Sequence, residues 1–556
     1  MPPIEAPATS CNIASHLPAM AARQPHKRAV VVPAGRDAMG NVTWAHSTFA
    51  QLDEASDRIP QGLESVGIRR GVRTVLMVKP SLDFFALVFA LYKVGAVLVL
   101  IDPGIGTRAL KTCLKEVEPE AFVGVPAAHV ARLIFRGSLR SVKINVTVGP
   151  RLFWGGHTLD GIRNKGPYTP YVMAETDPED VAAVLFTSGS TGIPKGAVYT
   201  HGMFDAQVRM LKAIYRFGDD EIDLPTFPLF ALFDPALGMT AVIPDMDARK
   251  PGSADPAKII EAIEDHGCTS MFGSPALLRN LGRYGVEHGV KLRSLRRVLS
   301  AGAPVPHDVL SNMHAMLQPG VEVFTPYGAT ESLPVANIGS REILEDTAEG
   351  TRAGQGICVG RPVEGARVRV IRITDDAIAA WSDDLELPAG EIGEITVQGA
   401  MVTRTYFARP DKTALAKIDD GGEVVHRMGD LGRFDEQGRL WMCGRKSHRV
   451  TTSEGPVFTV PVERIFDAHD GVLRTALVGI GAPGQQRPRL LVERQPGGAL
   501  SDGELIEALL AMGSELPITR GITDIALYPG AFPVDIRHNA KINREQLARW
   551  AAGQRA

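Results

Sequence analysis

Cysteine is scarce in this chain. Its 556 residues include only five cysteines, at Cys11, Cys113, Cys268, Cys358 and Cys443. No two of them form a Cys-x-x-Cys pair, so the sequence offers neither a zinc motif nor a disulfide framework. We expect all five to be buried structural thiols in a reducing compartment.

The sequence also lacks a strong net charge, a leader segment and an uninterrupted membrane-spanning run. A formal net charge of −3 gives no reason to expect nucleic acid or an anionic membrane as a partner. The first five residues have neither the basic start nor the apolar centre of a signal peptide, so we expect a cytoplasmic protein. Lys93 and Gly95 interrupt the apolar run 84–101, which favours a buried helix over 84–92 and a buried strand over 96–101.

The length points to more than one domain, since single cores stop growing at about 250 to 300 residues. Strand-like runs at 73–78 and 97–101 alternate with helix-like runs such as 49–66 in the first 180 residues. This alternation predicts βαβ units and a largely parallel sheet covered by helices.

A loop rich in hydroxyl groups and glycine follows an apolar, strand-like run at 181–186. It reads Thr187-Ser188-Gly189-Ser190-Thr191-Gly192-Ile193-Pro194-Lys195-Gly196. Glycines let the backbone approach a ligand, while hydroxyls, amides and a lysine bind phosphate oxygens. The spacing differs from the Walker pattern, because proline precedes the lysine and glycine follows it. The loop predicts a polyphosphate cradle, and the alternative is a mobile Ser/Gly connection between two strands.

Three later segments carry groups that suit the rest of a nucleotide. Small residues at 300–304 and 327–329, together with the ring of Tyr327, could flank a flat base. Thr330 offers a hydroxyl to phosphate and Glu331 a carboxylate to a hard cation. Asp430 could accept two hydrogen bonds from adjacent ribose hydroxyls. Taken singly, each segment could equally be a turn with a few polar groups.

Together and in this order, these motifs resemble those of the adenylate-forming superfamily of acyl-CoA synthetases, firefly luciferase and peptide-synthetase adenylation domains. Gly360-Arg361-Pro362, Gly393-Glu394-Ile395 and the 441–445 segment extend the resemblance. It implies that Thr187, Ser188, Gly189, Ser190, Thr191, Gly192 and Lys195 contact the ATP phosphates. It places the base among Gly302, Ala303, Pro304, Tyr327, Gly328 and Ala329, and the ribose near Asp430 and Arg445. Thr330 would contact the AMP phosphate, and Glu331 would help to hold Mg²⁺.

The resemblance also implies an α/β architecture in two parts. Residues 1–445 would form a large adenylation domain of helix-covered sheets with an acyl pocket, and residues 446–556 a small, mobile α+β lid. Near the chain end, Asn539-Ala540-Lys541 resembles the Ser-Gly-Lys of the family's closing motif. Lys541 would then bridge the substrate carboxylate and the α-phosphate, although a surface lysine before an amphipathic helix is the alternative.

Two segments depart from the family pattern. Phe230, Ala231, Phe233 and Asp234 would border the acyl pocket, although phenylalanines and leucines in so short a stretch could equally be plain core. Ala231 stands where family members commonly have histidine, and Asp234 where they have glycine. Ser447 replaces a hinge aspartate, and the loop 448–456 differs from the one that normally lines the route of a thiol acceptor.

Within the superfamily, the chain most resembles the β-lactone synthetases of bacterial olefin biosynthesis. That resemblance implies ATP- and Mg²⁺-dependent adenylation of a long-chain 2-alkyl-3-hydroxyalkanoic acid, and then attack by its own 3-hydroxyl to give a β-lactone, AMP and diphosphate. CoA would not be required, and other olefin-pathway enzymes could join it in an assembly. The alternatives are a long-chain fatty-acyl-CoA or acyl-AMP ligase, or a non-catalytic acyl- or nucleotide-binding scaffold. No histidine sits in a motif that identifies the base for ring closure.

The substitution Lys541→Ala tests the role that the resemblance gives to this lysine. We expect it to abolish ATP-dependent adenylate formation while ATP binding stays detectable, because loss of one charged contact in a closed site costs about 10² to 10³ in rate. Pyrophosphate release measures the reaction. A near-normal rate would remove Lys541 from the catalytic residues.

Overall fold

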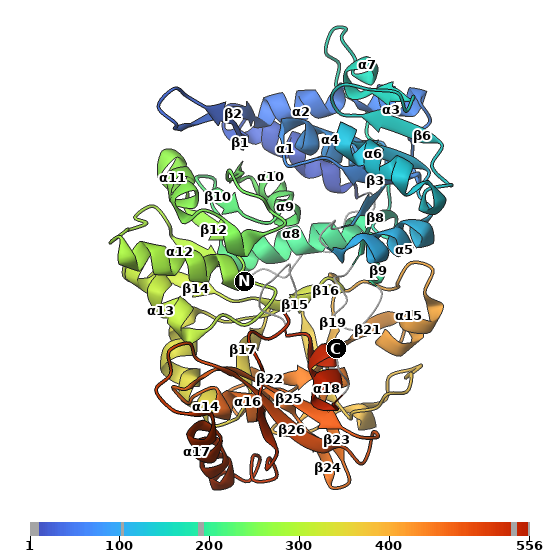
Figure 1. Cartoon of the computed structure of the whole chain (residues 1–556). Coiled ribbons are helices and arrows are strands. Elements are labelled where there is room, and N and C mark those ends of the chain that lie inside the picture. The colour runs from blue at the N-terminus through green and yellow to red at the C-terminus, as the bar shows by residue number, and fades with distance from the viewer. Residues whose placement is uncertain (1–10, 102–104, 187–193, 535–541, 554–556) are drawn as a thin grey trace.

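Two seven-stranded sheets form the larger part of the molecule (Figure 1). The computed structural model describes residues 11–101, 105–186, 194–534 and 542–553. One sheet has parallel neighbours except for its antiparallel last pair. Its order is β7 (His157–Thr158), β6 (Ile144–Thr147), β5 (Ala121–Gly124), β3 (Arg73–Met77), β4 (Val97–Leu100), β8 (Val181–Phe186) and β9 (Gly196–Thr200).

The second sheet is also parallel except at one edge, where β1 and β2 form an antiparallel pair. Its order is β14 (Glu322–Phe324), β13 (Arg297–Leu299), β12 (Ser270–Phe272), β10 (Ile222–Pro225), β11 (Thr240–Val242), β1 (Arg28–Arg36) and β2 (Val42–Thr48). The expected βαβ organisation is therefore confirmed for residues 73–186, whereas β1 and β2 belong to the other sheet.

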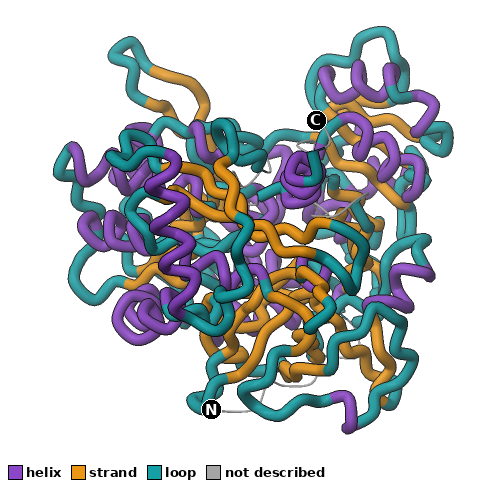
Figure 2. Tube along the Cα trace, turned by 60° about the horizontal axis from the view of Figure 1, so that its bottom comes forward, coloured by secondary structure: helices purple, strands orange, loops and turns teal. Residues whose placement is uncertain are grey.

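Helices cover both sheets and also fill the space between them. Helix α4 (Leu82–Lys93) contacts β4 of one sheet and β1 of the other, and it is buried on every side. The helices of this part are α1 (His16–Arg23), α2 (Phe49–Asp57), α3 (Pro60–Ser65), α5 (Thr107–Val117), α6 (Pro126–Ile134), α7 (Leu159–Ile162), α8 (His201–Tyr215), α9 (Pro228–Ala231), α10 (Phe233–Leu237), α11 (Pro256–His266), α12 (Pro275–Glu287) and α13 (His307–Met316). Figure 2 shows strands through the middle of the molecule and helices at its sides.

A third sheet of eight strands is antiparallel throughout. Its main path is β15 (Tyr327–Ala329), β16 (Ser332–Asn337), β17 (Ile357–Pro362), β22 (Leu440–Arg445), β21 (Glu423–Phe434), β19 (Gly393–Gln398) and β18 (Arg367–Ile371), and β20 (Lys417–Asp420) pairs with β21. The short helices α14 (Ala348–Arg352) and α15 (Pro410–Ala416) lie in its connections.

After β22 the chain forms a small α+β unit, at the bottom of Figure 1 in orange and red. Its elements are β23 (Val450–Thr452), β24 (Gly455–Val457), α16 (Thr459–Phe466), β25 (Val472–Ile480), β26 (Arg487–Arg494), α17 (Asp502–Glu515), β27 (Ile525–Leu527) and α18 (Arg544–Ala551). Strands β25, β26 and β27 form a three-stranded sheet, which α16 and α18 contact. The expected α/β fold with a small C-terminal α+β part is confirmed.

Two sequence predictions need correction. The helix-like run 49–66 is two helices, because Pro60 lacks the amide that would continue α2, and it begins α3 instead. Four of the cysteines are buried, but Cys11 is only partly buried. Burial raises the pKa of Cys113 and Cys443 to about 12, as expected for inert thiols.

The run that raised the question of a membrane span is the buried helix α4 followed by β4, as predicted. Within the described residues, no helix combines the length and the apolar character that crossing a bilayer would require. Lys93, at the end of α4, is only 1% exposed. Its Nζ lies 2.6 Å from Oδ1 of Asp53 and 2.5 Å from Oδ1 of Asp57, and Tyr168 donates to Oδ2 of Asp57 at 2.8 Å.

Lys93→Met should destabilise the protein by about 3–5 kcal/mol, because it leaves two carboxylates without their buried cation. The control is Arg372→Met, which removes an exposed ion pair with Asp384 and should leave the unfolding midpoint nearly unchanged. Urea unfolding followed by tryptophan fluorescence measures both. Equal midpoints for the two variants would contradict a stabilising role for the buried triad.

Candidate active site

A cavity of about 3080 Å³ lies where the three large sheets and the C-terminal unit meet. We call it the central cavity. Ligand pockets for small molecules usually enclose about 300–1,000 Å³, so it has room for a nucleotide and a long second ligand. Residues from all four parts line it, and among the sequence-predicted site residues these are Lys195, Phe230, Phe233, Asp234, Gly302, Ala303, Pro304, Tyr327, Gly328, Ala329, Thr330, Glu331, Asp430 and Arg445.

Some of the predicted site residues lie outside the described residues. They are Thr187, Ser188, Gly189, Ser190, Thr191, Gly192 and Lys541. Three described residues close to these two segments line the central cavity: Phe186 before the first, Lys195 shortly after it, and Ile542 directly after Lys541. Arg544, three residues after Lys541, donates to Oε2 of the buried Glu463 at 2.6 Å and so ties the start of α18 to α16.

The predicted ribose and base residues come together. Tyr327 Oη donates to Oδ2 of Asp430 at 2.7 Å, and Nε of Arg445 lies 3.1 Å from Oδ1 of the same carboxylate. Asp430 and Arg445 face each other across the antiparallel pair β21–β22, which explains why residues fifteen positions apart meet. The neighbouring Asp430 carboxylate raises the pKa of Arg445, so the guanidinium stays charged. The pair can present a carboxylate and a cation to a nucleotide.

The predicted phosphate and metal residues are joined through a tyrosine that no motif singled out. Tyr406 Oη donates to Oε1 of Glu331 at 2.6 Å, and Nζ of Lys195 donates to the Tyr406 oxygen at 3.2 Å. The ammonium group also lies 4.3 Å from the centre of the Tyr406 ring, a cation–π distance. Burial lowers the pKa of Lys195, and the Glu331 carboxylate opposes this shift.

Backbone pairing fixes the position of Tyr406. The segment 405–407 runs alongside β9, with Phe407 N donating to Gly196 O at 2.7 Å and an antiparallel bridge between Ala197 and Tyr406. The tyrosine is thus held beside Lys195, the residue that precedes β9. On the other side, Thr403 N donates to Glu331 O at 2.9 Å.

A buried lysine, Lys417, stabilises the contact between Thr403 and the backbone of Glu331. Nζ of Lys417 donates to Oγ1 of Thr403 at 3.1 Å, and Thr403 Oγ1 in turn lies 3.1 Å from the carbonyl oxygen of Glu331. Burial lowers the pKa of Lys417 to about 7, although the Glu331 carboxylate favours its charged form. The backbone around Glu331 is therefore fixed by polar contacts on both sides.

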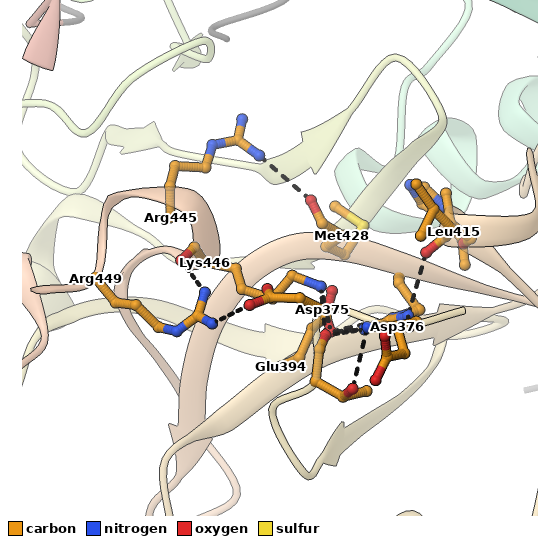
Figure 3. A network of polar contacts seen from close by, with 12 residues as sticks. Asp375, Asp376, Glu394, Leu415, Met428, Arg445, Lys446 and Arg449 are labelled. Carbon is orange, nitrogen blue, oxygen red and sulfur yellow. Dashed lines mark hydrogen bonds and ion pairs between the residues drawn. The ribbon is translucent and has the colours of Figure 1, made fainter. Parts of the chain in front are cut away.

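Another polar network ties β21 to the start of the C-terminal unit (Figure 3). The buried Glu394 lies 2.6 Å from Nη2 of Arg427 and 3.0 Å from Nζ of Lys446, through the same carboxylate oxygen. Arg427 also donates to the carbonyl oxygens of Asp376 and Leu415, at 2.6 and 3.2 Å. Since Arg427 lies three residues before Asp430, and Lys446 directly follows Arg445, this network helps to fix both of these predicted nucleotide-binding residues.

Aromatic side chains form the apolar wall of the central cavity. The rings of Phe230 and Phe272 are 4.4 Å apart, and those of Phe204 and Phe233 are 6.1 Å apart. Phe230, Phe233 and Asp234 line the cavity as expected for the acyl pocket. Ala231 does not: it is 0% exposed and packs in the hydrophobic core. The short α9 turns this side chain away from the wall, which corrects the expectation for this residue.

The polar groups around Glu331 are typical of a magnesium site that is completed by substrate and water, and not of a metal site made only of protein ligands. Within the described residues, no group of three or more histidine, cysteine, aspartate and glutamate side chains could hold a metal ion. Mg²⁺ is commonly bound by one or two carboxylates together with substrate phosphates and water. Glu331 supplies one such carboxylate beside Thr330, at the side of the cavity that carries Lys195.

Several residues of this site carry no sequence signal of their own. Tyr406 and Thr403 contact Glu331 from more than 70 positions away, Lys417 contacts Thr403, and no spacing rule links them to Glu331. Tyr199, which donates to Thr330 O, lies within β9 and resembles any core tyrosine. Glu394 is the exception, because it lies in Gly393-Glu394-Ile395, one of the segments that resemble family motifs.

Comparison with known proteins finds relatives over nearly the whole chain. Two relatives match almost end to end: olefin beta-lactone synthetases of Xanthomonas campestris pv. campestris, 52% identical over 98% of both chains, and of Stenotrophomonas maltophilia, 51% identical over 98% of both chains. A long-chain-fatty-acid–CoA ligase of Thermus thermophilus is 25% identical over 84% of both chains.

Solved structures share the fold over nearly the whole length. The amide bond synthetase McbA from Marinactinospora thermotolerans superimposes with a TM-score of 0.79 at 22% identity, covering 97% of this chain and 99% of its own. ATP-bound MatB from Rhodopseudomonas palustris gives a TM-score of 0.75 at 20% identity, covering 98% and 99%. The sequence pattern of AMP-binding enzymes matches residues 17–407. With its motifs assembled around one cavity, the chain belongs to the AMP-binding enzyme family.

Proposed function

We propose that this protein is an ATP-dependent, AMP-forming β-lactone synthetase that acts on a long-chain 2-alkyl-3-hydroxyalkanoic acid. The observation that carries the proposal is the identity of 52% and 51%, over 98% of the chain, to two olefin beta-lactone synthetases. A central cavity with a charged side and an aromatic side supports it, because the reaction needs a nucleotide and an apolar acid in one space. A cytoplasmic location and an assembly with other olefin-pathway enzymes belong to the same proposal.

In the first half-reaction the carboxylate oxygen of the substrate attacks the α-phosphorus of ATP and diphosphate leaves. Catalysis is then mostly positioning and charge neutralisation. Asp430 binds the ribose hydroxyls, with Tyr327 and Arg445 fixing its orientation. Lys195 and the loop 187–192 hold phosphate oxygens, and Thr330 contacts the α-phosphate. Mg²⁺, held in part by Glu331, would neutralise phosphate charge.

Residues 446–556 act as a lid in this proposal and bring Lys541 to the α-phosphate. Their own three-stranded sheet and hydrophobic core support treating them as a separate unit. Residues from both parts line the central cavity, including Glu463 and Arg474 from the C-terminal side. The junction at Lys446 lies directly beside Arg445, so a rotation there would alter the surroundings of the nucleotide.

In the second half-reaction the substrate's own 3-hydroxyl attacks the adenylated carbonyl and forms the ring C–O bond. AMP leaves with the bonding electrons of the mixed anhydride, and the hydroxyl proton passes to the departing phosphate. The nucleophile is already part of the bound molecule, so the protein need only hold it close and in line. The aromatic wall around Phe230 and Phe233 would hold the alkyl chains and exclude water. No thiol acceptor takes part, in keeping with the departures at Ala231 and after Ser447.

Product analysis tests the proposal directly. Incubation of the protein with a long-chain 2-alkyl-3-hydroxy acid, ATP and Mg²⁺ should give a β-lactone, AMP and diphosphate at the same rate with and without CoA. NMR identifies the lactone ring. A thioester that forms only with CoA would instead support an acyl-CoA ligase, and binding without diphosphate release across an acid panel would support a scaffold.

Asp430→Asn tests the nucleotide site. The amide cannot pair with Arg445 as the carboxylate does and accepts ribose hydrogen bonds more weakly; hydrogen bonds to charged groups contribute about 1.5–3 kcal/mol each. We therefore expect AMP to bind roughly 10- to 100-fold more weakly, measured by calorimetry.

Glu436→Gln is the matched control for this experiment. It lies exposed in the turn of the same β21–β22 hairpin and should leave AMP affinity unchanged. Equal affinities for Asp430→Asn and the control would argue against a ribose contact at Asp430.

A further inference from the structure

A buried carboxyl group lies in the apolar wall of the central cavity. Asp234, in the first turn of α10, lines the cavity and is only 5% exposed. Its Oδ2 atom accepts no hydrogen bond from any residue that the structure describes. Leaving a buried polar atom without a partner costs about 1–3 kcal/mol. A ligand group that satisfied this oxygen would recover that energy.

The surroundings of Asp234 favour the uncharged form of its carboxyl group. Phe233 precedes Asp234 in the chain, and the aromatic pair Phe230–Phe272 lines the same cavity. Burial raises the pKa of Asp234 well above its usual range, and the carboxyl of Asp223 on β10 reinforces the shift. A protonated carboxyl has one hydroxyl donor and an acceptor oxygen, so it can both give and accept a hydrogen bond. That combination matches an alcohol.

Asp223 is a second buried carboxyl on this wall, 6% exposed, and its Oδ1 also has no partner among the described residues. It differs from Asp234 in its neighbours: burial raises the pKa of Asp223 to about 6, with Glu221 adding to the shift and Ser270 and Arg297 opposing it. Asp223 therefore supplies an internal comparison for any role given to Asp234.

A chain of aromatic contacts connects Asp234 to the phosphate side of the cavity. Tyr199 Oη donates to the carbonyl oxygen of Thr330. The Tyr199 ring stacks on Phe204 with 4.8 Å between centroids, and Phe204 lies 6.1 Å from Phe233, the residue before Asp234. This series of contacts runs from Thr330, the residue expected to contact the α-phosphate, to Phe233, the residue before Asp234.

We propose that the Asp234 carboxyl binds the 3-hydroxyl of the substrate and so selects 3-hydroxy acids over acids that lack this group. The inference rests on the proposed function and adds a specificity-determining residue to it. The hydrogen bond holds the hydroxyl at a fixed place beside the acyl group while the alkyl chains lie against the phenylalanines. A site built to bind a hydroxyl group discriminates strongly against the analogue without it, because its own polar group is then left buried and unpaired.

The test compares two substrates that differ only at carbon 3: a long-chain 2-alkyl-3-hydroxy acid and the 3-deoxy acid with the same chains. The readout is kcat/KM for diphosphate release by the full-length protein. We expect the wild type to prefer the hydroxy acid by a factor of about 10² or more. Asp234→Leu should lower this ratio to within about tenfold of one, mainly by loss of activity on the hydroxy acid.

Asp234→Asn is the conservative variant, since an amide also offers a donor and an acceptor in the same shape. It should keep most of the preference, so that a changed substrate ratio is confined to folded variants that lose the hydrogen bond. Asp234→Ala removes the carboxyl without added bulk and carries the same expectation as the leucine variant should that one fail to fold. AMP binding by calorimetry reports the folded state of each variant.

The outcomes separate the inference from the function on which it rests. No diphosphate release with either acid, or a product that is a CoA thioester, would overturn the β-lactone function. Lactone formation by a folded Asp234→Leu or Asp234→Ala protein with an unchanged substrate ratio would overturn the inference alone. Loss of the preference in Asp223→Leu but not in these variants would also overturn it, because the hydroxyl would then lie at Asp223.

Discussion

The hydrogen bond from Tyr406 to Glu331, 2.6 Å long, joins the parts of the chain on which the site depends. Glu331 lies between β15 and β16 of the antiparallel sheet, while Tyr406 is paired with β9 at the edge of a mainly parallel one. Lys195 donates to the same tyrosine oxygen. The expected metal-binding carboxylate and the expected phosphate-binding lysine are therefore fixed relative to each other by one side chain, although 135 residues of sequence separate them.

Burial shifts the pKa values of the charged groups in this site. Lys195 and Lys417 both have lowered pKa values because their ammonium groups are out of water, and Glu331 compensates them only in part. A polyphosphate brought to this side of the cavity would supply the missing negative charge and favour the charged form of Lys195. Arg445 instead has its carboxylate partner in place, so it stays charged and oriented before any ligand arrives.

Motifs made it possible to predict that Tyr327, Asp430 and Arg445 belong to one site, because each lies in a short motif and the motifs follow a fixed order. In the structure, the side chains of Tyr327 and Arg445 both lie within hydrogen-bond distance of the Asp430 carboxylate. Tyr406 could not be found in this way, since its role comes from pairing between distant segments. Hydrophobic periodicity correctly located α4 and β4. It also predicted one helix over 49–66, but Pro60 has no amide to continue α2 and begins α3 instead.

The cavity wall that carries the predicted acyl-pocket residues is built from the short helices α9 and α10 rather than from sheets. Family members commonly have a histidine at the position of Ala231, and here that side chain is a methyl group packed in the core. Three residues later Asp234 places a carboxyl on the cavity wall, so a polar group is lost at one position and gained at another. Because α9 and α10 carry none of the nucleotide contacts described above, such an exchange can change which acid fits without disturbing ATP. A rigid sheet scaffold that holds the nucleotide residues, with specificity set by short connecting elements, lets one fold serve different second half-reactions.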